Sequence, residues 1–289
     1  MTIATIDIGG TGIKFASLTP DGKILDKTST PTPDTLEDLL AWLDQRLSEQ
    51  DYRGIAMSVP GAVNQKTGVI EGISAIPYIH GFSWYQVLAH HQLPVHLEND
   101  ANCVGLSELL AHPEIENAAC VVIGTGIGGA MIINGKLHRG RHGLGGEFGY
   151  MTTLAPTEKL NNWSQLASTG SMVRYVNEKS GQSDWDGRKI YQEAAANNVL
   201  CQEAIERMNR NLAQGLLNIQ YLIDPDVISL GGSISQNPDF INGVQKAVDA
   251  FVERYEEYTI APVIQACTYQ ADANLYGALV NWLQEENQW

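Results

Sequence analysis

The sequence predicts an α/β protein with a duplicated architecture, and three observations support this prediction. Segments with strand character alternate with segments of helical spacing along the 289 residues. Two glycine-rich turns, at residues 9–12 and 124–129, each follow an apolar run. A strand, a turn and two further strands open the chain at residue 2, and the same order recurs from residue 119. The sequence match between the two halves is weak, so the duplication is one of architecture.

The elements of the first half follow from local patterns. The expected strands are short apolar or alternating runs bounded by turn residues, and they are 2–9, 14–18, 23–27, 54–59 and 93–97. Pro20-Asp21-Gly22 is typical of a hairpin turn between two of them. Leucines at intervals of three and four predict a helix over 35–50, and a second helix begins at Asp100 and continues through Leu110.

The second half repeats this organisation with longer helices. The expected strands are 119–123, 130–133, 227–230 and 263–266. Residues 141–170 show little periodicity and are expected to form a loop, with a helix from about Trp163. Further helical patterns cover 189–222, 239–255 and 275–284.

Composition limits the class of protein. The formal net charge of −15 argues against nucleic acid or an anionic membrane as a partner, because both need cationic patches. Residues 1–5 have neither the basic region nor the apolar run of a signal peptide, and no segment has the length of a membrane span. The four cysteines are widely spaced and are expected to be isolated, reduced core thiols. We therefore expect a cytoplasmic protein.

The two glycine-rich turns predict a nucleotide phosphate chain held from two sides. Glycine allows positive φ and a close approach of the backbone to a ligand, and successive N–H groups form a nest for phosphate oxygens. Asp7 belongs to the motif of the first turn, Ile6 to Gly12, where it would repel a bare phosphate. A carboxylate at this position is explained if Mg²⁺ or its waters lie between, since this ion prefers carboxylate, phosphate and water ligands.

An ordered set of motifs resembles the ROK family of sugar kinases nearly from end to end. Each motif is weak alone, and the set is specific: Asp7-Ile8-Gly9-Gly10-Thr11 with Lys14, Glu98-Asn99-Asp100-Ala101-Asn102 with Glu108, Gly124-Thr125-Gly126-Ile127-Gly128-Gly129, Gly145-Gly146-Glu147-Phe148-Gly149, and Gly231-Gly232-Ser233. The resemblance extends to glucokinase, N-acetylmannosamine kinase and β-glucoside kinase. It implies the two-lobed, actin-like (ribonuclease H-like) ATPase fold with an active-site cleft between the lobes. The implied lobes are residues 1–115, with a C-terminal helix at about 272–289 packing back on them, and residues 116–271.

The resemblance implies that Asp100 is the general base. In the family this carboxylate accepts the proton of the sugar hydroxyl that attacks the γ-phosphate, and it chiefly orients the nucleophile. A helix N-terminus would favour its ionised form. The alternative is a simple N-terminal cap, a role for which Asp is well suited.

Other residues are implied to contact the sugar. Asn99 would present its amide to sugar hydroxyls, or else stabilise its own turn. Glu147 would accept hydroxyl protons, or else be a solvated loop residue. Gly61 is placed at the sugar by the same resemblance. Tyr78 and His80 are candidates for the pocket rim, whereas Trp84 is expected to begin a helix and pack in the core.

The nucleotide site is implied by three segments. ATP, with Mg²⁺ near Asp7, would be held by residues that the family uses for phosphates and adenosine, namely Asp7, Gly9, Gly10, Thr11, Lys14, Gly124, Thr125, Gly126, Gly128, Gly231 and Gly232. Lys14 has the alternative of being an exposed strand lysine. The glycine pair 231–232 has the alternative of an ordinary strand-to-helix turn.

The chain departs from the family pattern at its zinc motif. Tyr150 stands where many members have His, and Thr157 to Trp163 contains no cysteine, so no structural zinc is expected. Ser164 aligns with a family Glu that contacts the sugar. A smaller Ser and the flat face of Tyr150 suggest a substrate with an anomeric substituent, such as a disaccharide or glucoside. The alternative is a simple hexose whose contacts come from other loops.

The leading prediction is an ATP-dependent kinase that phosphorylates a hexose or hexoside, most favourably at the 6-hydroxyl. A sugar-sensing repressor is disfavoured, because the first strand begins at residue 2 and the chain is acidic. A catalytically weak sugar- or nucleotide-binding protein of the same family is the remaining alternative. The resemblance also implies a homodimer formed through the C-terminal lobe.

Overall fold

The computed structural model describes residues 2–153 and 161–289. The chain divides into two compact units. The first comprises Met1–Glu114, Arg139–Gly145 and Ala271–Trp289, and the second comprises Ile115–His138 and Gly146–Gln270. Relative to the expected lobes, the segment Arg139–Gly145 groups with the first unit instead of the second.

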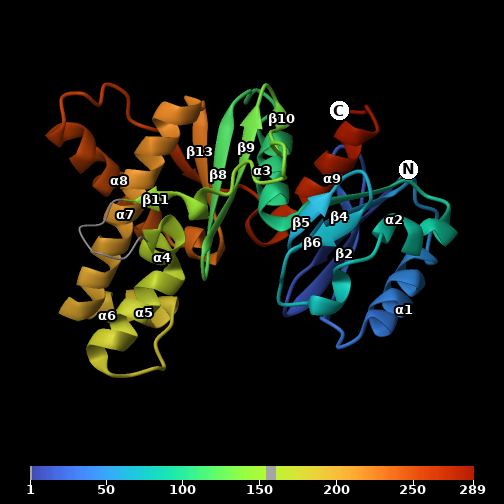
Figure 1. The fold of residues 1–289 in the computed structure, drawn as a ribbon, viewed down its shortest axis with the longest axis horizontal. Helices are drawn as coiled ribbons and strands as arrows, with labels where there is room; N and C mark the ends of the chain where they lie inside the picture. Colours follow the sequence, from blue (N-terminus) through green and yellow to red (C-terminus); the bar gives the residue numbers. More distant parts are fainter. Residues whose placement is uncertain (1, 154–160) are drawn as a thin grey trace. The chain divides into compact units, whose positions relative to one another are not determined.

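The first unit is built on a five-stranded mixed sheet in the order β3-β2-β1-β4-β7. Its strands are β1 (Ile3–Ile8), β2 (Gly12–Leu18), β3 (Ile24–Pro31), β4 (Ile55–Val59) and β7 (Val95–Asn99). Figure 1 labels β2 and β4 of this sheet, with α9 (Ala273–Glu285) from the C-terminal end of the chain in the same unit. β1, β2 and β3 form an antiparallel meander, and β4 and β7 continue the sheet in parallel with β1. Every residue of β1 and β4 is buried, including the polar Thr5, Asp7 and Ser58.

Helices cover this sheet. Its main helices are α1 (Leu36–Leu47), α3 (Asp100–Ala111) and α9 (Ala273–Glu285). Thr35 caps α1 by accepting from Asp38 N, and the helix buries Leu39 and Leu43 in the core. α9 packs so closely against α3 that a Cβ at Gly277 would lie 1.7 Å from the carbonyl oxygen of Cys103. The C-terminal helix therefore joins the N-terminal unit, because its apolar face is needed to complete that core.

The second unit repeats the architecture with the sheet order β10-β9-β8-β13-β14. Its strands are β8 (Ala118–Ile123), β9 (Ile127–Ile133), β10 (Lys136–Leu137), β13 (Val227–Gly231) and β14 (Ile264–Ala266). β8, β9 and β10 form the meander, and β13 and β14 run parallel to β8. The same strand order and directions in both units confirm the predicted duplication.

The helices of the second unit are α4 (Trp163–Ala167), α5 (Thr169–Ser180), α6 (Gly187–Ala195), α7 (Val199–Ile223) and α8 (Pro238–Arg254). The helical patterns expected over 189–222 form two helices, because the chain breaks between α6 and α7. Asn197 takes a φ of 68°, and the Asn198 side chain caps α7 by accepting from Leu200 N and Cys201 N. Asparagine tolerates the left-handed region and competes for backbone N–H groups, which ends one helix and starts the next.

Small elements without long periodicity escaped the sequence analysis. They are the antiparallel pairs β5 (Ala62–Asn64) with β6 (Val69–Glu71) and β11 (Thr152–Thr153) with β12 (Asn161–Asn162), and the 3₁₀ turns η1 (Pro77–Ile79), η2 (Ala89–His91), η3 (Phe148–Tyr150), η4 (Ser233–Gln236) and η5 (Gln270–Asp272). The short helix α2 (Trp84–Val87) begins at the expected residue, and Trp84 is fully buried, as expected.

Candidate functional site

The first glycine turn connects β1 to β2 and places Asp7 beside Lys14. These two residues are direct partners across the antiparallel pair. Asp7 is 7% exposed, and its carboxylate accepts from Lys14 Nζ at 3.1 Å and from Asn274 Nδ2 of α9 at 2.8 Å. Lys14 Nζ also donates to the Ala271 carbonyl oxygen. Lys14 therefore pairs with Asp7, and 34% of its side chain remains exposed.

The glycines of residues 9–12 and 124–129 matter because they lack a Cβ atom, and not because they adopt positive φ. Positive φ values occur at several glycines but at none of those in residues 9–12 or 124–129. A Cβ at Gly9 would lie 3.0 Å from Gly12 O, and one at Gly129 would lie 2.5 Å from Phe148 Cδ2. A Cβ at Gly124 would meet no atom within 4 Å. The expectation of positive φ is thus wrong for these turns, and Gly124 leaves room for a ligand to approach the backbone.

The junction of β7 and α3 holds the candidate base. Asn99 is the cap of α3, with Oδ1 accepting from Ala101 N at 2.9 Å and Asn102 N at 3.2 Å. Asp100 is the first residue within the helix, so the alternative of Asp100 as the cap is wrong by one residue. Its Oδ1 accepts from Ala101 N at 2.8 Å and from Asn99 Nδ2 at 3.0 Å.

The environment of Asp100 raises the pKa of its carboxyl group. Burial is the largest cause, and the negative charge of Asp7 adds to it, while the hydrogen bonds from Ala101 and Asn99 act in the opposite direction. The helix N-terminus by itself would favour the ionised form. Desolvation outweighs it. A carboxyl group with a raised pKa is better matched to proton transfer near neutral pH than an ordinary Asp.

The amide of Asn99 is fully engaged within the protein. Its two N–H groups donate to Asp100 Oδ1 and to Gly61 O, at 3.1 Å, and its oxygen accepts two backbone N–H groups. This arrangement satisfies every donor and acceptor of a side-chain amide. Asn99 thus ties the turn after β4 to the start of α3, which favours the structural alternative. A sugar contact requires one of these bonds to be exchanged.

Gly61 has a conformational reason to be glycine. Its φ is 108°, and a Cβ there would lie 2.9 Å from Ile70 Cγ2 and 3.1 Å from His80 Cε1. His80 Nε2 lies 2.7 Å from Ser74 Oγ, and its Nδ1 is buried with no hydrogen-bond partner among the described residues. Tyr78, the other predicted rim residue, donates its hydroxyl to Pro33 O. His80 therefore lies at the turn that Asn99 holds, whereas the Tyr78 hydroxyl is engaged elsewhere.

An ion pair missed by the sequence analysis supports this junction. Glu98 is 2% exposed, and its Oε2 accepts from Arg139 Nε at 2.6 Å. Arg139 Nη2 also donates to Asn281 Oδ1 and Glu285 Oε1 on α9. Burial alone would lower the pKa of Arg139, but the neighbouring carboxylates more than reverse this, so its pKa is raised. Glu98 belongs to the Glu98–Asn102 motif, but its partner Arg139 is 41 residues away, and no pattern in the nearby sequence indicated this pairing.

In the second unit, the turn between β8 and β9 is held by the start of α5. Ser168 caps α5 and donates its hydroxyl to Thr125 O at 3.0 Å, while Gly170 N donates to Gly124 O at 3.2 Å. Residues 124–126 remain exposed. The start of α5 therefore holds the carbonyl groups of Gly124 and Thr125, and the exposed side of the turn is left open to a ligand.

The two glycine motifs of the second unit border one cavity of about 510 Å³. It is lined by residues from the β8–β9 turn, α5, the start of α6 and the turn after β13, namely Gly124, Thr125, Thr169, Gly170, Val173, Arg174, Trp185, Asp186, Gly187 and Ser233. Gly232 has a φ of 89°, and a Cβ there would lie 2.1 Å from Ile123 O. Gly232 therefore allows the turn after β13 to pack against Ile123 at the end of β8. Because β13 and β8 are parallel neighbours, the turns that follow them lie at the same edge of the sheet.

The residues predicted at the anomeric end of the sugar also lie in the second unit. Glu147 precedes η3, and Tyr150 is 73% exposed. Ser164 Oγ accepts from Ile127 N at 2.9 Å and donates to Ile127 O at 3.3 Å. A Cβ at Gly149 would lie 2.3 Å from this hydroxyl oxygen. Ser164 thus ties α4 to β9, while the ring of Tyr150 is free to face a ligand.

The cysteines are buried free thiols, as expected, but two of them are not isolated. Cys120 Sγ lies 3.7 Å from Cys267 Sγ, although 147 residues separate them. Most of the cysteine-free stretch from Thr157 to Trp163 lies outside the described residues.

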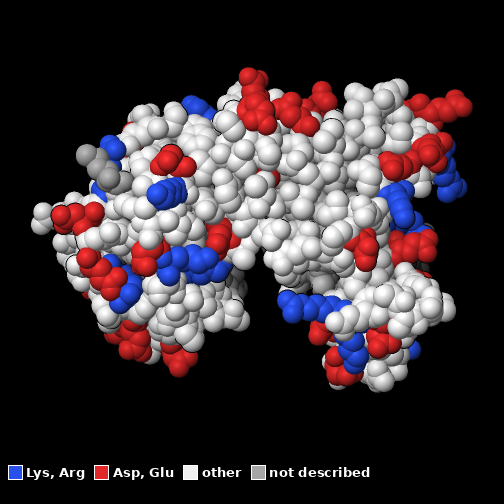
Figure 2. Space-filling model, turned by 180° about the vertical axis from the view of Figure 1, so that it is seen from behind, with Lys and Arg blue, Asp and Glu red and all other residues white. Residues whose placement is uncertain are grey.

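Charged side chains are mixed on the surface. On the face drawn in Figure 2, Lys and Arg side chains lie beside Asp and Glu side chains instead of gathering into one broad field. Within residues 2–153 and 161–289, no helix is long and apolar enough to cross a membrane.

Comparisons with known proteins identify the family. The ROK family model matches residues 3–285. A β-glucoside kinase from Listeria monocytogenes is 35% identical over 298 residues, covering 100% of this chain and 99% of that protein. The crystal structure of a ROK family protein from Streptococcus pneumoniae in complex with sucrose has 88% identity and a TM-score of 0.98, with 100% of both chains covered.

A third comparison concerns the nucleotide. The ROK family glucokinase from Streptomyces griseus, in complex with glucose and AMPPNP, has 25% identity and a TM-score of 0.76. The alignment covers 96% of this chain and 98% of that chain. The two repeated sheets are those of the actin-like, two-lobed ATPase fold that these kinases share. The chain therefore belongs to the ROK family.

Proposed function

We propose that this carbohydrate kinase transfers the γ-phosphoryl group of ATP to the 6-hydroxyl of a hexose or hexoside, with Asp100 as the general base. The environment of Asp100 is the observation that supports the proposal most directly. Its carboxyl group is fixed at the first turn of α3 by two hydrogen bonds, and its pKa is raised by burial. A protein that only bound sugar would gain little from a carboxylate positioned in this way.

The proposed transfer uses one oxygen of this carboxylate. Asp100 Oδ1 accepts two hydrogen bonds, so Oδ2 is the atom available for the hydroxyl proton. The sugar oxygen forms a bond to the γ-phosphorus as the bond from phosphorus to the β-phosphate oxygen breaks, and ADP leaves. The proton passes to Asp100 and then to solvent. Asn99 keeps the carboxylate in position by joining it to Gly61.

The cavity of the second unit is the proposed adenosine site. The open turn at Gly124 and Thr125 would bind phosphate oxygens through backbone N–H groups. The apolar surfaces of Val173 and Trp185 line the same cavity and would contact the adenine ring. Bound Mg²⁺ would offset phosphate charge, and Asp7 is the carboxylate suited to hold one of its waters.

The acceptor we propose is a sugar with an anomeric substituent. The names of the relatives support this class, because one is a β-glucoside kinase and one was crystallised with sucrose. In this chain, the exposed ring of Tyr150 offers a surface on which a second sugar ring could stack. Ser164 does not contribute a contact in the same way, because its hydroxyl is bonded to Ile127.

A coupled ADP-release assay tests the proposal. Wild-type protein is supplied with Mg-ATP and with sucrose, cellobiose, a β-glucoside, glucose or N-acetylmannosamine. D100N keeps a side chain of the same shape and should lower kcat by about 10²–10⁴-fold. D26N, at an exposed position of β3, is the control and should leave the rate unchanged.

The outcomes separate the parts of the proposal. Phosphorus-coupled NMR of the product identifies the phosphorylated hydroxyl, and a signal at any position other than the 6-oxygen would reject that assignment. A wide preference for glucose would reject the substituted acceptor while leaving the kinase intact. Sugar binding without ADP release on any acceptor would favour the catalytically weak binding protein.

A further inference from the structure

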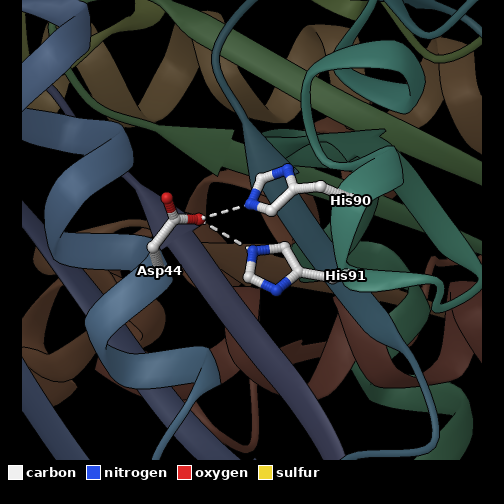
Figure 3. Close-up of side chains that lie close together, drawn as sticks. All are labelled: Asp44, His90 and His91. Carbon is white, nitrogen blue, oxygen red and sulfur yellow. Dashed lines mark hydrogen bonds and ion pairs between the residues drawn. The ribbon is translucent and has the colours of Figure 1, made fainter.

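Two adjacent histidines and one aspartate converge at a position outside the proposed kinase site. Asp44 lies on α1, and His90 and His91 end the 3₁₀ turn η2. Figure 3 shows both imidazole rings pointing toward the same carboxylate oxygen. Asp44 Oδ1 is 3.0 Å from His90 Nε2 and 2.8 Å from His91 Nε2, and the two ring centres are 4.1 Å apart.

Both ring nitrogens of His90 face hydrogen-bond acceptors. Its Nδ1 lies 3.0 Å from the Val87 carbonyl oxygen, which can only accept, so Nδ1 carries a hydrogen. Its Nε2 faces a carboxylate oxygen, which also only accepts. A neutral ring would therefore direct a lone pair at Asp44 Oδ1. A metal ion ligated by both residues would use this lone pair.

We propose that Asp44, His90 and His91 bind a divalent transition-metal ion of the Zn²⁺ type. Two imidazole nitrogens and one carboxylate oxygen form a donor set that suits Zn²⁺, with water as the fourth ligand. The three ligand atoms lie within 4.8 Å of one another. His90 already has the arrangement typical of a metal-ligating histidine, because its other ring nitrogen donates to a backbone carbonyl.

The exposure of the three side chains suits exchange of an ion with solvent. The exposed fractions are 56% for His90, 46% for Asp44 and 15% for His91. A bound ion would cross-link α1 to η2, two elements that are separated by 42 residues or more in the chain. The segment after η2 leads directly into β7, which ends at Asn99. The ion would thus stabilise the connection between η2 and β7.

Titration calorimetry with ZnCl₂ tests the site on the untagged chain after removal of metal with EDTA. We expect one Zn²⁺ per chain. H90A, H91A and D44N should each weaken the affinity by at least about 10-fold. H112A is the matched control, because His112 also lies beside a carboxylate, Glu114 at 3.5 Å, but without a second histidine. Its affinity should equal that of the wild type.

Histidine nitrogen NMR gives a second, independent readout. With Zn²⁺ bound, His90 should carry its hydrogen on Nδ1 and show the chemical shift of a metal-bound Nε2, and this metal-bound signal should be absent in D44N. Failure to bind Zn²⁺, or equal affinity in wild type, H90A and H91A, would overturn the proposal and leave a protonated imidazole paired with Asp44. Because His90 is well exposed, H90A keeps the test valid even if H91A proves unstable.

Discussion

Replacing Glu98 by Gln should destabilise the first unit, because this buried carboxylate is the acceptor for four donors. Its Oε1 accepts from Asn99 N at 2.8 Å and Asn102 Nδ2 at 2.9 Å, and its Oε2 accepts from Gln65 Nε2 and Arg139 Nε. A glutamine would turn its NH₂ group toward one of these pairs, so donors would face donors. It would also leave the guanidinium group without its closest carboxylate.

The expected loss follows from the burial of the pair. Removing one partner of a buried ion pair costs about 3–5 kcal/mol. Arg139 keeps 28% of its side chain exposed, which allows water to screen part of its charge and places the loss near the lower end. A loss of about 3 kcal/mol corresponds to a fall in melting temperature of roughly 6–12 °C for a unit of this size.

Thermal unfolding followed by circular dichroism measures this effect. E71Q is the control, because Glu71 accepts from Asn64 Nδ2 at an exposed position of the same unit. A double-mutant cycle with R139M isolates the pair, and the double variant should lose less stability than the sum of the two single variants. Equal melting temperatures for E98Q and E71Q, or additive losses in the cycle, would refute the reasoning.

Three further predictions follow from single side chains. Because burial raises the pKa of Asp100, its ionised form opposes folding, so D100N should be more stable than wild type at neutral pH. This gain in stability should vanish below about pH 3.9, where the carboxyl group is also protonated in the unfolded chain. Denaturant titrations at pH 7 and pH 3.5 measure the gain. A gain that persists at pH 3.5 would contradict burial of the Asp100 carboxylate as its cause. G61A should lose about 1–3 kcal/mol in the same titration, because its φ of 108° is strained for alanine, and unchanged stability would argue against the observed turn. G124A should fold normally, since its Cβ meets no atom, yet raise the KM for ATP by about 10-fold or more. G129A should instead lose at least about 1 kcal/mol of stability, because the new methyl group would collide with Phe148. A destabilised G124A together with a stable G129A would disprove the assignment of Gly124 to ligand binding and Gly129 to packing.

The order of strands and helices, the duplication and the turns that contain the motifs could be predicted from the sequence. Short, mostly apolar runs such as residues 3–8 and 55–59 predict strands, and the leucine spacing of α1 needs no distant partner to be recognised. The sequence pattern did not predict the break between α6 and α7, because the two helices have a similar periodicity. The break lies in the positive φ of Asn197 and the cap formed by Asn198. Local sequence carries these features because backbone conformation and side-chain periodicity are properties of neighbouring residues.

The environment of each candidate residue required the tertiary structure. The motif predicted an ionised Asp100, but burial by surrounding elements reversed the direction of its pKa shift. Arg139 reached Glu98 across 41 residues, and Asp44 met His90 across 46, with no signal in either local pattern. The sequence by itself determined which residues could carry charge, hydrogen bonds or a tight turn. Only the tertiary structure decided which of them met, because desolvation and pairing depend on distances between segments far apart in the chain.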